Sequence, residues 1–442
     1  METAAAPSRD PAEPVPYGSR AYSWYVMLVL AAIFLCQALD RGLPNILLEP
    51  IRKEFHLSDS QLGLFSGLGY AVAFSALVLP MGYVSDRVNR RTFLGVILLA
   101  WSLCTSLGGF ARGYAHLVLA RLGVGGAESG AASAILPMVS DIFPAERRGF
   151  AMGMVYIGNS LGTLVASLAG GLIAAEYGWR AAFFIAGVPG ALLALLLFTT
   201  VREPARGGSD AGGATAAGAK PPRLRDVFAF LIRSPGLICL ILGCAITGMV
   251  SISVGTWLAS FFIRLHHLPL KQVGVIIGVA AGLGGALSPP LLSAIGDRLR
   301  THDLRGPLIL VAGALLGAAA GGWVLVTSPS VGLAVAMLIL TNLLQTGYSP
   351  PSYAVLLNNV PPQLRGSAMS IIQLTTNIFG YGLGPVLVGV LSDLYGRETG
   401  LRWAIGNAYT MLLLAAVLLL AAAGLLYGVG PRPRAPRTAL AP

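Results

Sequence analysis

The loop after the second long apolar segment reads GYVSDRVNRR (residues 82–91), and its central pattern returns 211 residues later as SAIGDR (residues 293–298). A second stretch, PAERRGFAM (residues 144–152), returns 217 residues later as PPQLRGSAM (residues 361–369). Two independent matches at nearly the same offset are hard to produce by chance. They predict that the chain is an internal duplication, with equivalent loops in its two halves.

The composition places these loops between membrane-spanning segments. The chain has 442 residues, of which 55% are hydrophobic and 11% are charged, whereas a soluble domain has about 25% charged residues. A bilayer-spanning helix needs about 20 mostly apolar residues. The sequence therefore excludes a water-soluble fold and predicts an all-α integral membrane protein with twelve transmembrane helices as two six-helix repeats. The twelve segments begin near Trp24, Ser60, Arg91, His116, Arg148, Trp179, Pro235, Lys271, Gly306, Val331, Leu364 and Arg402.

The polar interruptions define the domains and the orientation. With the N-terminus placed inside, the tails and alternate loops hold twenty Lys and Arg residues, against eight in the opposite loops. Since basic loops stay in the cytoplasm, both termini are predicted to be cytoplasmic, in a multi-pass protein of the inner (plasma) membrane. We expect a disordered tail at 1–20, a first half at 21–201, a flexible linker at 202–234, a second half at 235–428 and a tail at 429–442.

Other classes of function lack their characteristic residues. The basic residues form short clusters rather than a stripe, which argues against nucleic-acid binding. The four cysteines lie in apolar runs without a Cys-x-x-Cys pattern, so neither a disulfide nor a metal site is expected. No cofactor is expected either. A lipid-modifying membrane enzyme would need a base, a nucleophile or metal ligands clustered at an interface, and a receptor with this architecture would bind without flux. We predict neither.

The duplicated six-helix plan resembles the major facilitator superfamily, and residues 82–91 resemble its signature loop. The resemblance implies a substrate site near the midplane between the halves. It also implies that an aspartate of the loop faces a helix N-terminus and that its arginines pair with acids at neighbouring cytoplasmic helix ends. The cytoplasmic gating motif would comprise Gly82, Asp86, Arg87, Arg90 and Arg91, with Asp141 as the acid within reach.

Three stretches are similar to bacterial members of the spinster family, namely LDR (39–41), RLGVGGAES (121–129) and GNSLG (158–162). Animal relatives of that family carry lysophospholipids and sphingosine phosphate, so the resemblance implies an amphipathic organic anion as substrate. Organic-anion:cation symporters share the charged residues of these helices. Drug:proton antiporters usually have Gly-Pro where Gly162 and Thr163 stand here. The alternatives are a proton symporter of small organic or sugar acids and, less favoured, a multidrug:proton antiporter.

Four charges lie well inside the predicted helices, and each costs roughly 2.5 to 3.5 kcal/mol to insert. They are Asp40, Arg41, Arg121 and Glu128. Two acids and two arginines allow an ion-paired network when the site is empty. Burial raises a carboxylic acid's pKa and a nearby arginine lowers it. We therefore expect protonation of Glu128 or Asp40 to release an arginine, which then takes an anionic head group.

The second half offers neutral polar groups in place of charges, so its wall of the site should suit an apolar tail. A proton-coupled secondary transporter, monomeric in the bilayer and driven by the proton gradient, is the function that these features favour. The residues expected to bind the substrate are Arg41, Arg121, Gln37, Asn159, Tyr348, Gln373 and Asn377, with Asp40 and Glu128 coupling the proton.

Overall fold

A computed structural model describes residues 17–205, 229–361, 364–396 and 399–428 of the chain. The C-terminal tail, most of the expected N-terminal tail and the centre of the expected linker lie outside these residues. The first half contains α1 (Arg20–Phe55), α2 (Asp59–Gly63) with η1 (Leu64–Leu68) and α3 (Gly69–Ser85), α4 (Arg90–Gly108), α5 (Tyr114–Glu128) with α6 (Ala131–Ile142), α7 (Ala145–Tyr177) and α8 (Trp179–Thr200).

The second half repeats this plan within its described residues. It contains α10 (Pro235–Leu265), α11 (Leu270–His302), α12 (Gly306–Thr327), α13 (Val331–Gln345) with η2 (Thr346–Tyr348) and α14 (Ser349–Asn359), α15 (Arg365–Asn377) with η4 (Ile378–Leu383) and α16 (Gly384–Tyr395), and α17 (Gly400–Tyr427). Each half thus supplies six long segments, which begin within a few residues of the predicted positions.

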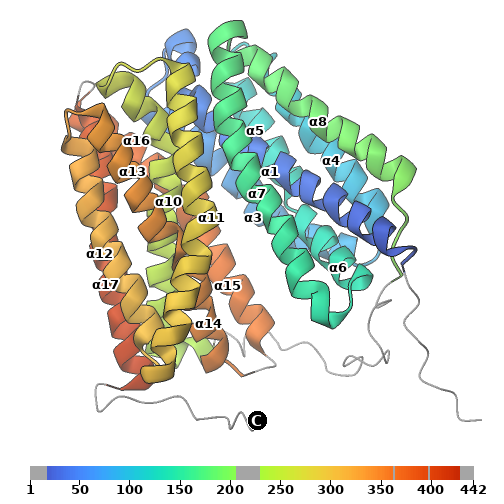
Figure 1. Cartoon of the computed structure of the whole chain (residues 1–442). Coiled ribbons are helices and arrows are strands. Elements are labelled where there is room, and N and C mark those ends of the chain that lie inside the picture. The colour runs from blue at the N-terminus through green and yellow to red at the C-terminus, as the bar shows by residue number, and fades with distance from the viewer. Residues whose placement is uncertain (1–16, 206–228, 362–363, 397–398, 429–442) are drawn as a thin grey trace, which may run out of the picture.

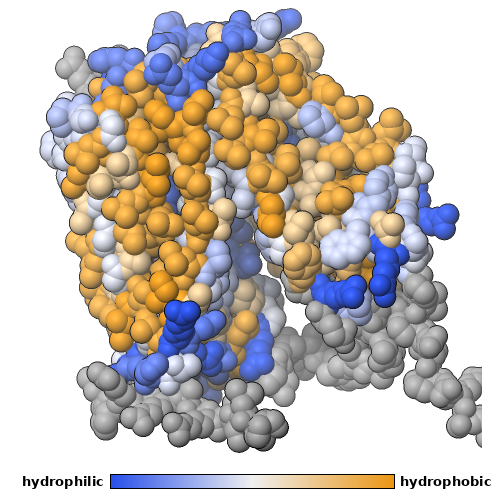
Figure 2. All heavy atoms as spheres, viewed as in Figure 1, coloured by the Kyte–Doolittle hydropathy of each residue, from blue (hydrophilic) through white to orange (hydrophobic). Residues whose placement is uncertain are grey.

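Eleven of these segments in the described chain are long and apolar enough to cross a bilayer. The fourth segment falls short because Ser129 and Gly130 interrupt it between α5 and α6. The first helix begins at Arg20 rather than near Trp24, because the Ser19 hydroxyl accepts a hydrogen bond from the backbone N–H of Tyr22 at 3.2 Å. Apolar side chains cover the outer face between two hydrophilic ends (Figure 2).

The two halves meet at one end of the molecule and spread apart at the other (Figure 1). We call the end that carries residues 200–205 and 229–234 the linker end, and the end at which the halves meet the closed end. Between the halves, a cleft opens toward the linker end, with hydrophilic side chains visible inside it (Figure 2). The bundle is therefore accessible from the linker end.

A cluster of charges joins the halves at the closed end. The guanidinium of Arg264, at the end of α10, donates two hydrogen bonds of 2.7 Å to the carboxylate of Asp59 and one of 2.6 Å to Glu49. Both acids belong to the first half and are about 95% buried. From the second half, Asp393 accepts the backbone N–H groups of Asp59 and Ser60 and so caps α2. This closed-end cluster is the main polar contact between the halves among the described residues.

The second and eleventh segments also touch each other, through π-helical turns. The turn η1 lies between α2 and α3, and the turn η4 lies between α15 and α16. A methyl group added at Gly67 in η1 would press against the carbonyl oxygen of Tyr381 in η4. Glycine at this position therefore allows the two backbones to approach.

The predicted duplication is visible in a shared contact. The Nε of Arg148 donates to the carbonyl oxygen of Phe143, and the Nε of Arg365 donates to that of Val360, both at 3.3 Å. These pairs are separated by the same 217 residues as the sequence match. Equivalent residues thus fix equivalent chain turns in the two halves.

Helices α1 and α7 pack backbone to backbone through Gly158 and Gly162, where a methyl group would overlap the carbonyl oxygen of Ala31 or Leu35. We expect Gly162→Ala to force the helices apart and to destabilise the protein by about 1 to 3 kcal/mol. Gly153→Ala, on the same helix with no atom within 4 Å of the added methyl group, is the matched control. The unfolding temperature of the purified protein should drop by several degrees for Gly162→Ala only. Equal unfolding temperatures in the two variants would contradict the packing argument.

Replacement of Arg264 by Met should open the closed end, because removing one partner of a buried ion pair costs roughly 3 to 5 kcal/mol and hydration of Glu49 and Asp59 relieves that cost. Spin labels at the exposed positions Lys53 and His267, in a background without native cysteines, report the separation of the halves. We expect a new population at longer distance.

Arg180→Met is the control, since Arg180 pairs with Glu54 within the first half. An unchanged distance distribution in Arg264→Met would show that the cluster does not hold the halves together.

Candidate functional site

An ion pair at the centre of the first half organises the candidate site. The Nε of Arg41 on α1 donates to Oε2 of Glu128 on α5 at 2.8 Å, and the hydroxyl of Tyr70 on α3 donates to the same oxygen at 2.9 Å. Gln37 donates its side-chain N–H to the backbone carbonyl of Glu128 at 3.3 Å. Glu128 lies at the end of α5, next to the break in the fourth segment, so Gln37 satisfies one of the carbonyls that the helix end leaves free.

The second acid and the second arginine do not form a matching ion pair. Arg121 donates through Nη1 to the backbone carbonyl of Asp40 at 3.1 Å, and not to its carboxylate. Of the two ion pairs expected from the sequence, the structure thus shows one, between Arg41 and Glu128. The reason is geometric: Asp40 and Arg41 point about 100° apart around α1, so the Asp40 side chain faces α4, where Thr105 and Trp101 lie.

The ring of Tyr70 contacts both arginines. The guanidinium carbon of Arg41 is 5.3 Å from the ring centroid, and that of Arg121 is 5.2 Å from it. Phe74, one turn along α3, also contacts Arg41 at 5.4 Å. Cation–π contacts of this kind stabilise a charge that has little water around it. Sequence reasoning did not identify Tyr70, although its spacing of four residues from Phe74 marks one aromatic face of the helix.

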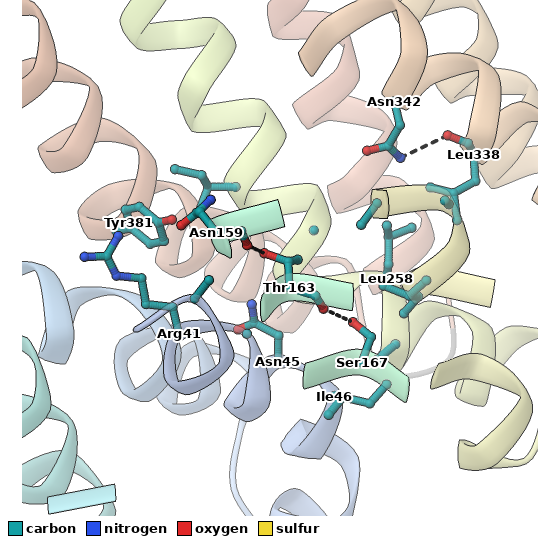
Figure 3. A pocket seen from close by; sticks show the side chains of 18 residues that line it. Arg41, Asn45, Ile46, Asn159, Thr163, Ser167, Leu258, Leu338, Asn342 and Tyr381 are labelled. Atoms are coloured by element: carbon teal, nitrogen blue, oxygen red, sulfur yellow. Dashed lines mark hydrogen bonds between the residues drawn. The ribbon is translucent and has the colours of Figure 1, made fainter. Parts of the chain in front are cut away.

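A cavity of about 170 Å³ lies between the halves (Figure 3). Arg41 carries the one charge among the eighteen described residues that line it, and its side chain is 21% exposed. In Figure 3 the guanidinium of Arg41 points toward Tyr381, and Asn159, Thr163 and Ser167 follow one another along α7. The lining residues are Ala38, Arg41, Gly42, Asn45, Ile46, Asn159, Thr163, Ser167, Ile252, Gly255, Leu258, Ala259, Ile277, Ala280, Ala281, Leu338, Asn342 and Tyr381.

The two walls of this central cavity differ in polarity. The first half contributes Arg41, Asn45, Asn159, Thr163 and Ser167, whereas the second half contributes mostly aliphatic side chains, with Asn342 and Tyr381 as its polar groups. The hydroxyls of Thr163 and Ser167 donate back to carbonyls of α7, so their oxygens are left as acceptors toward the cavity. A ligand with a polar, anionic end and an apolar end matches this arrangement.

The other residues singled out from the sequence lie apart from this cavity. Gln37, Asp40, Arg121 and Glu128 are buried behind its first wall. Tyr348 is buried within the second half. On α15, Gln373 is exposed and Asn377 is half-buried, and neither lines the cavity.

Several lining residues were missed by sequence reasoning, and most of them had a signal. Asn45 follows Arg41 by one helical turn, and Thr163 and Ser167 follow Asn159 at the same spacing, which places each set on one helix face. Tyr381 also lies one turn beyond Asn377, but the π-helical turn η4 changes the face on which it appears.

The residues of the predicted gating motif lie at the linker end. Arg90 forms an ion pair of 2.7 Å with Asp141, the acid expected from the sequence. Arg91 donates to the carbonyl of Phe198, and the Arg87 guanidinium lies over the ring of Tyr83. The side chain of Asp86 is 67% exposed. Gly82 lies near the end of α3, in the turn before this loop.

Glu203, which sequence reasoning did not consider, caps α4 by accepting the backbone N–H groups of Arg90 and Arg91 at 2.8 and 2.7 Å. The start of the linker is thereby attached to the loop of residues 82–91. A carboxylate at this position also suits the positive end of the helix dipole.

Comparison with known proteins agrees with this architecture. The sequence model of the Major Facilitator Superfamily matches residues 30–380 and 303–442. The chain is 30% identical over 402 residues to an MFS-type efflux pump of Mycolicibacterium smegmatis, covering 90% of this chain and 91% of that protein. It is 27% identical over 399 residues to mouse protein spinster homolog 1, covering 86% and 75%.

A solved structure of similar fold is that of a bacterial homolog to the human lysosomal transporter Spinster, in an inward-facing and occupied conformation. It has a TM-score of 0.82 and 25% sequence identity, and the match covers 92% of this chain and 97% of that one. The two-half architecture, the central cavity and the match along most of the sequence agree: this multi-pass membrane protein belongs to the major facilitator superfamily of transporters.

Proposed function

We propose that this secondary transporter moves an amphipathic organic anion, of the lysophospholipid or sphingolipid kind, in exchange with or together with protons. The observation that carries the proposal is the double role of Arg41. Its guanidinium is the charged group of the central cavity, and it is also the partner of the buried Glu128. One cation thus has two possible anionic partners, a protein carboxylate and the substrate.

Competition for Arg41 couples the proton to the substrate. When Glu128 is protonated, its charge no longer holds the guanidinium. The planar guanidinium of Arg41 can then donate two parallel hydrogen bonds to a phosphate or carboxylate. Because binding equilibria are reciprocal, a bound anion in turn favours a protonated Glu128. Tyr70 remains hydrogen-bonded at Glu128 in either case and keeps both arginines in place.

The two unlike walls of the cavity support the amphipathic character of the substrate. The head group would lie against Arg41 and the amides of Asn45 and Asn159, and the tail would lie against Leu258, Ile277 and their neighbours. The similarity to spinster proteins supports the same class of substrate.

The distribution of basic residues supports the sidedness. Since the linker end carries the excess of Lys and Arg, we infer that it faces the cytoplasm and that the cleft opens inward. Breaking the closed-end cluster and closing the loop of residues 82–91 against the second half would expose the cavity to the opposite side, as alternating access requires.

A small organic or sugar acid is the second candidate substrate. It is favoured by the acceptors that Thr163 and Ser167 present and by the amide of Asn342 on the opposite wall. Such a ligand would form hydrogen bonds with the second wall of the cavity, whereas a lipid tail would make apolar contacts there.

Removal of either buried acid should uncouple flux from the proton gradient. In proteoliposomes with an imposed pH gradient, each coupled proton contributes about 1.4 kcal/mol, or tenfold in accumulation, per pH unit. We expect Glu128→Gln and Asp40→Asn to lose this stimulation for a fluorescent lysophospholipid while still binding it. Full proton dependence retained in both variants would refute the coupling.

Arg41→Gln should abolish stabilisation by anionic amphiphiles. A ligand at about 100 times its Kd contributes about 2.7 kcal/mol to stability, which a thermal-shift measurement detects. We expect a lysophospholipid or a sphingoid phosphate to stabilise the parent protein, and to do so more strongly at the lower of two pH values, where Glu128 releases Arg41.

Arg180→Gln, which removes an arginine at the closed-end surface, should behave as the parent. Stabilisation by sugar acids alone would select the second candidate substrate. Stabilisation by cationic amphiphiles alone would point to multidrug transport and would overturn both.

A further inference from the structure

A second, much smaller cavity lies inside the first half. Its volume is about 10 Å³, and it is enclosed by α1, η1, α4, α5 and α8. The polar residues that line it are Asp40, Thr105 and Arg121, and the remaining walls are formed by Cys104 and by apolar residues such as Phe65 and Phe183. No lining residue is shared with the central cavity.

Three polar atoms of this small cavity have no direct hydrogen-bond partner among the described residues. They are Oδ1 of Asp40, Oγ1 of Thr105 and Nε of Arg121. Each residue is more than 95% buried. Buried polar atoms in native proteins are nearly always paired, with protein or with ordered water, so three unpaired atoms around one cavity call for a common partner.

A single water molecule fits this environment. A cavity of roughly 10 to 15 Å³ holds one water, which needs two to four polar partners. Here Asp40 offers an acceptor, Arg121 offers a donor, and the Thr105 hydroxyl can act as either. A metal cation is disfavoured, because the guanidinium of Arg121 already brings a positive charge to the cavity.

We propose that this cavity binds one water molecule bridging Asp40, Thr105 and Arg121, and that this water, rather than the solvent of the central cavity, is the hydrogen-bond partner of the Asp40 carboxyl group. The proposal rests on the proton coupling proposed above and adds a separate place for the proton. Thr105 is then a positioning residue for the water that contacts the carboxyl group.

The two neighbours on α1 serve different cavities because they point about 100° apart around the helix. Arg41 lines the central cavity and Asp40 lines the small one. They are connected through Arg121, which donates to the carbonyl of Asp40 and contacts the same Tyr70 ring as Arg41. A charge change at Asp40 therefore reaches Arg41 through Arg121 and Tyr70, without a shared solvent space.

Few other groups that carry charge or titrate face Asp40. Arg121 and Glu128 approach it from α5, and Cys36 lies one turn before it on α1. Cys104 on α4 lines the same cavity, and α8 contributes only Phe183. Arg121 and Glu128 bring opposite charges to Asp40, so the loss of the bridging water's hydrogen bond should change the midpoint of its titration measurably.

Infrared difference spectroscopy of the intact protein in lipid vesicles tests the proposal without any substrate. A pH step reveals the band of the Asp40 carboxyl group, which Asp40→Asn identifies by its loss. We expect Thr105→Val to move the midpoint of this band to higher pH by about one unit, because the water that bonds the ionised carboxylate loses the partner that positions it, and a hydrogen bond to an ionised group contributes about that much. Thr105→Ser should restore the parent midpoint.

Thr163→Val is the matched control, because it removes the same hydroxyl from the central cavity and should leave the midpoint unchanged. In the parent protein, the same pH step should also reveal a water O–H band that shifts in ¹⁸O-labelled water. Absence of that band, or equal midpoints in the parent and Thr105→Val, would overturn the proposal.

A midpoint that shifts as much in Thr163→Val as in Thr105→Val would show that Asp40 responds equally to the central cavity, and it would overturn the separate site. Failure of lysophospholipid flux would leave all of these measurements unaffected, so the proposed function and the separate proton site can fail independently.

Discussion

A charge buried in a membrane protein must have a partner, and the ion pair between Arg41 and Glu128 is where this requirement shapes the protein most. The pair fixes α1 against α5, and Tyr70 and Gln37 are held in place by their bonds to Glu128. Because Arg41 also reaches the central cavity, the bond that stabilises the empty site is the one that an anionic substrate must replace. Stability and binding therefore depend on the same guanidinium.

The closed-end cluster joins the two halves, whereas the pair of Arg41 and Glu128 lies within one half. Arg264 joins acids from the other half, so its bonds exist only while the halves touch at that end. The loop of residues 82–91, by contrast, is bonded within its own half through Asp141 and Glu203. One end of the transporter is thus held by bonds between the halves and the other by bonds within one half, which explains why the cleft opens toward the linker end.

The sequence predicted the architecture well, because twelve apolar segments and two repeated loops leave few arrangements open. Arg41, Arg121, Asp40 and Glu128 were conspicuous since charge is rare inside such segments. Their pairing was not predictable in full, because the direction of the Asp40 side chain depends on how α1 is rotated against α4. Tyr70, Thr105 and Tyr381 were missed for a related reason: hydroxyl and aromatic residues are common in apolar helices, and only the packing reveals which of them meet a charge.

The π-helical turns η1 and η4 have a mechanical consequence. A π-turn bonds residue i to i+5 where an α-turn bonds i to i+4, so a bulge can pass along a helix by exchanging bonds one at a time. The residues that the bulge passes rotate by about 100° about the helix axis. A shift of η4 by one residue would therefore turn the ring of Tyr381 away from Arg41, whose guanidinium carbon lies 5.9 Å from the ring centroid in this structure.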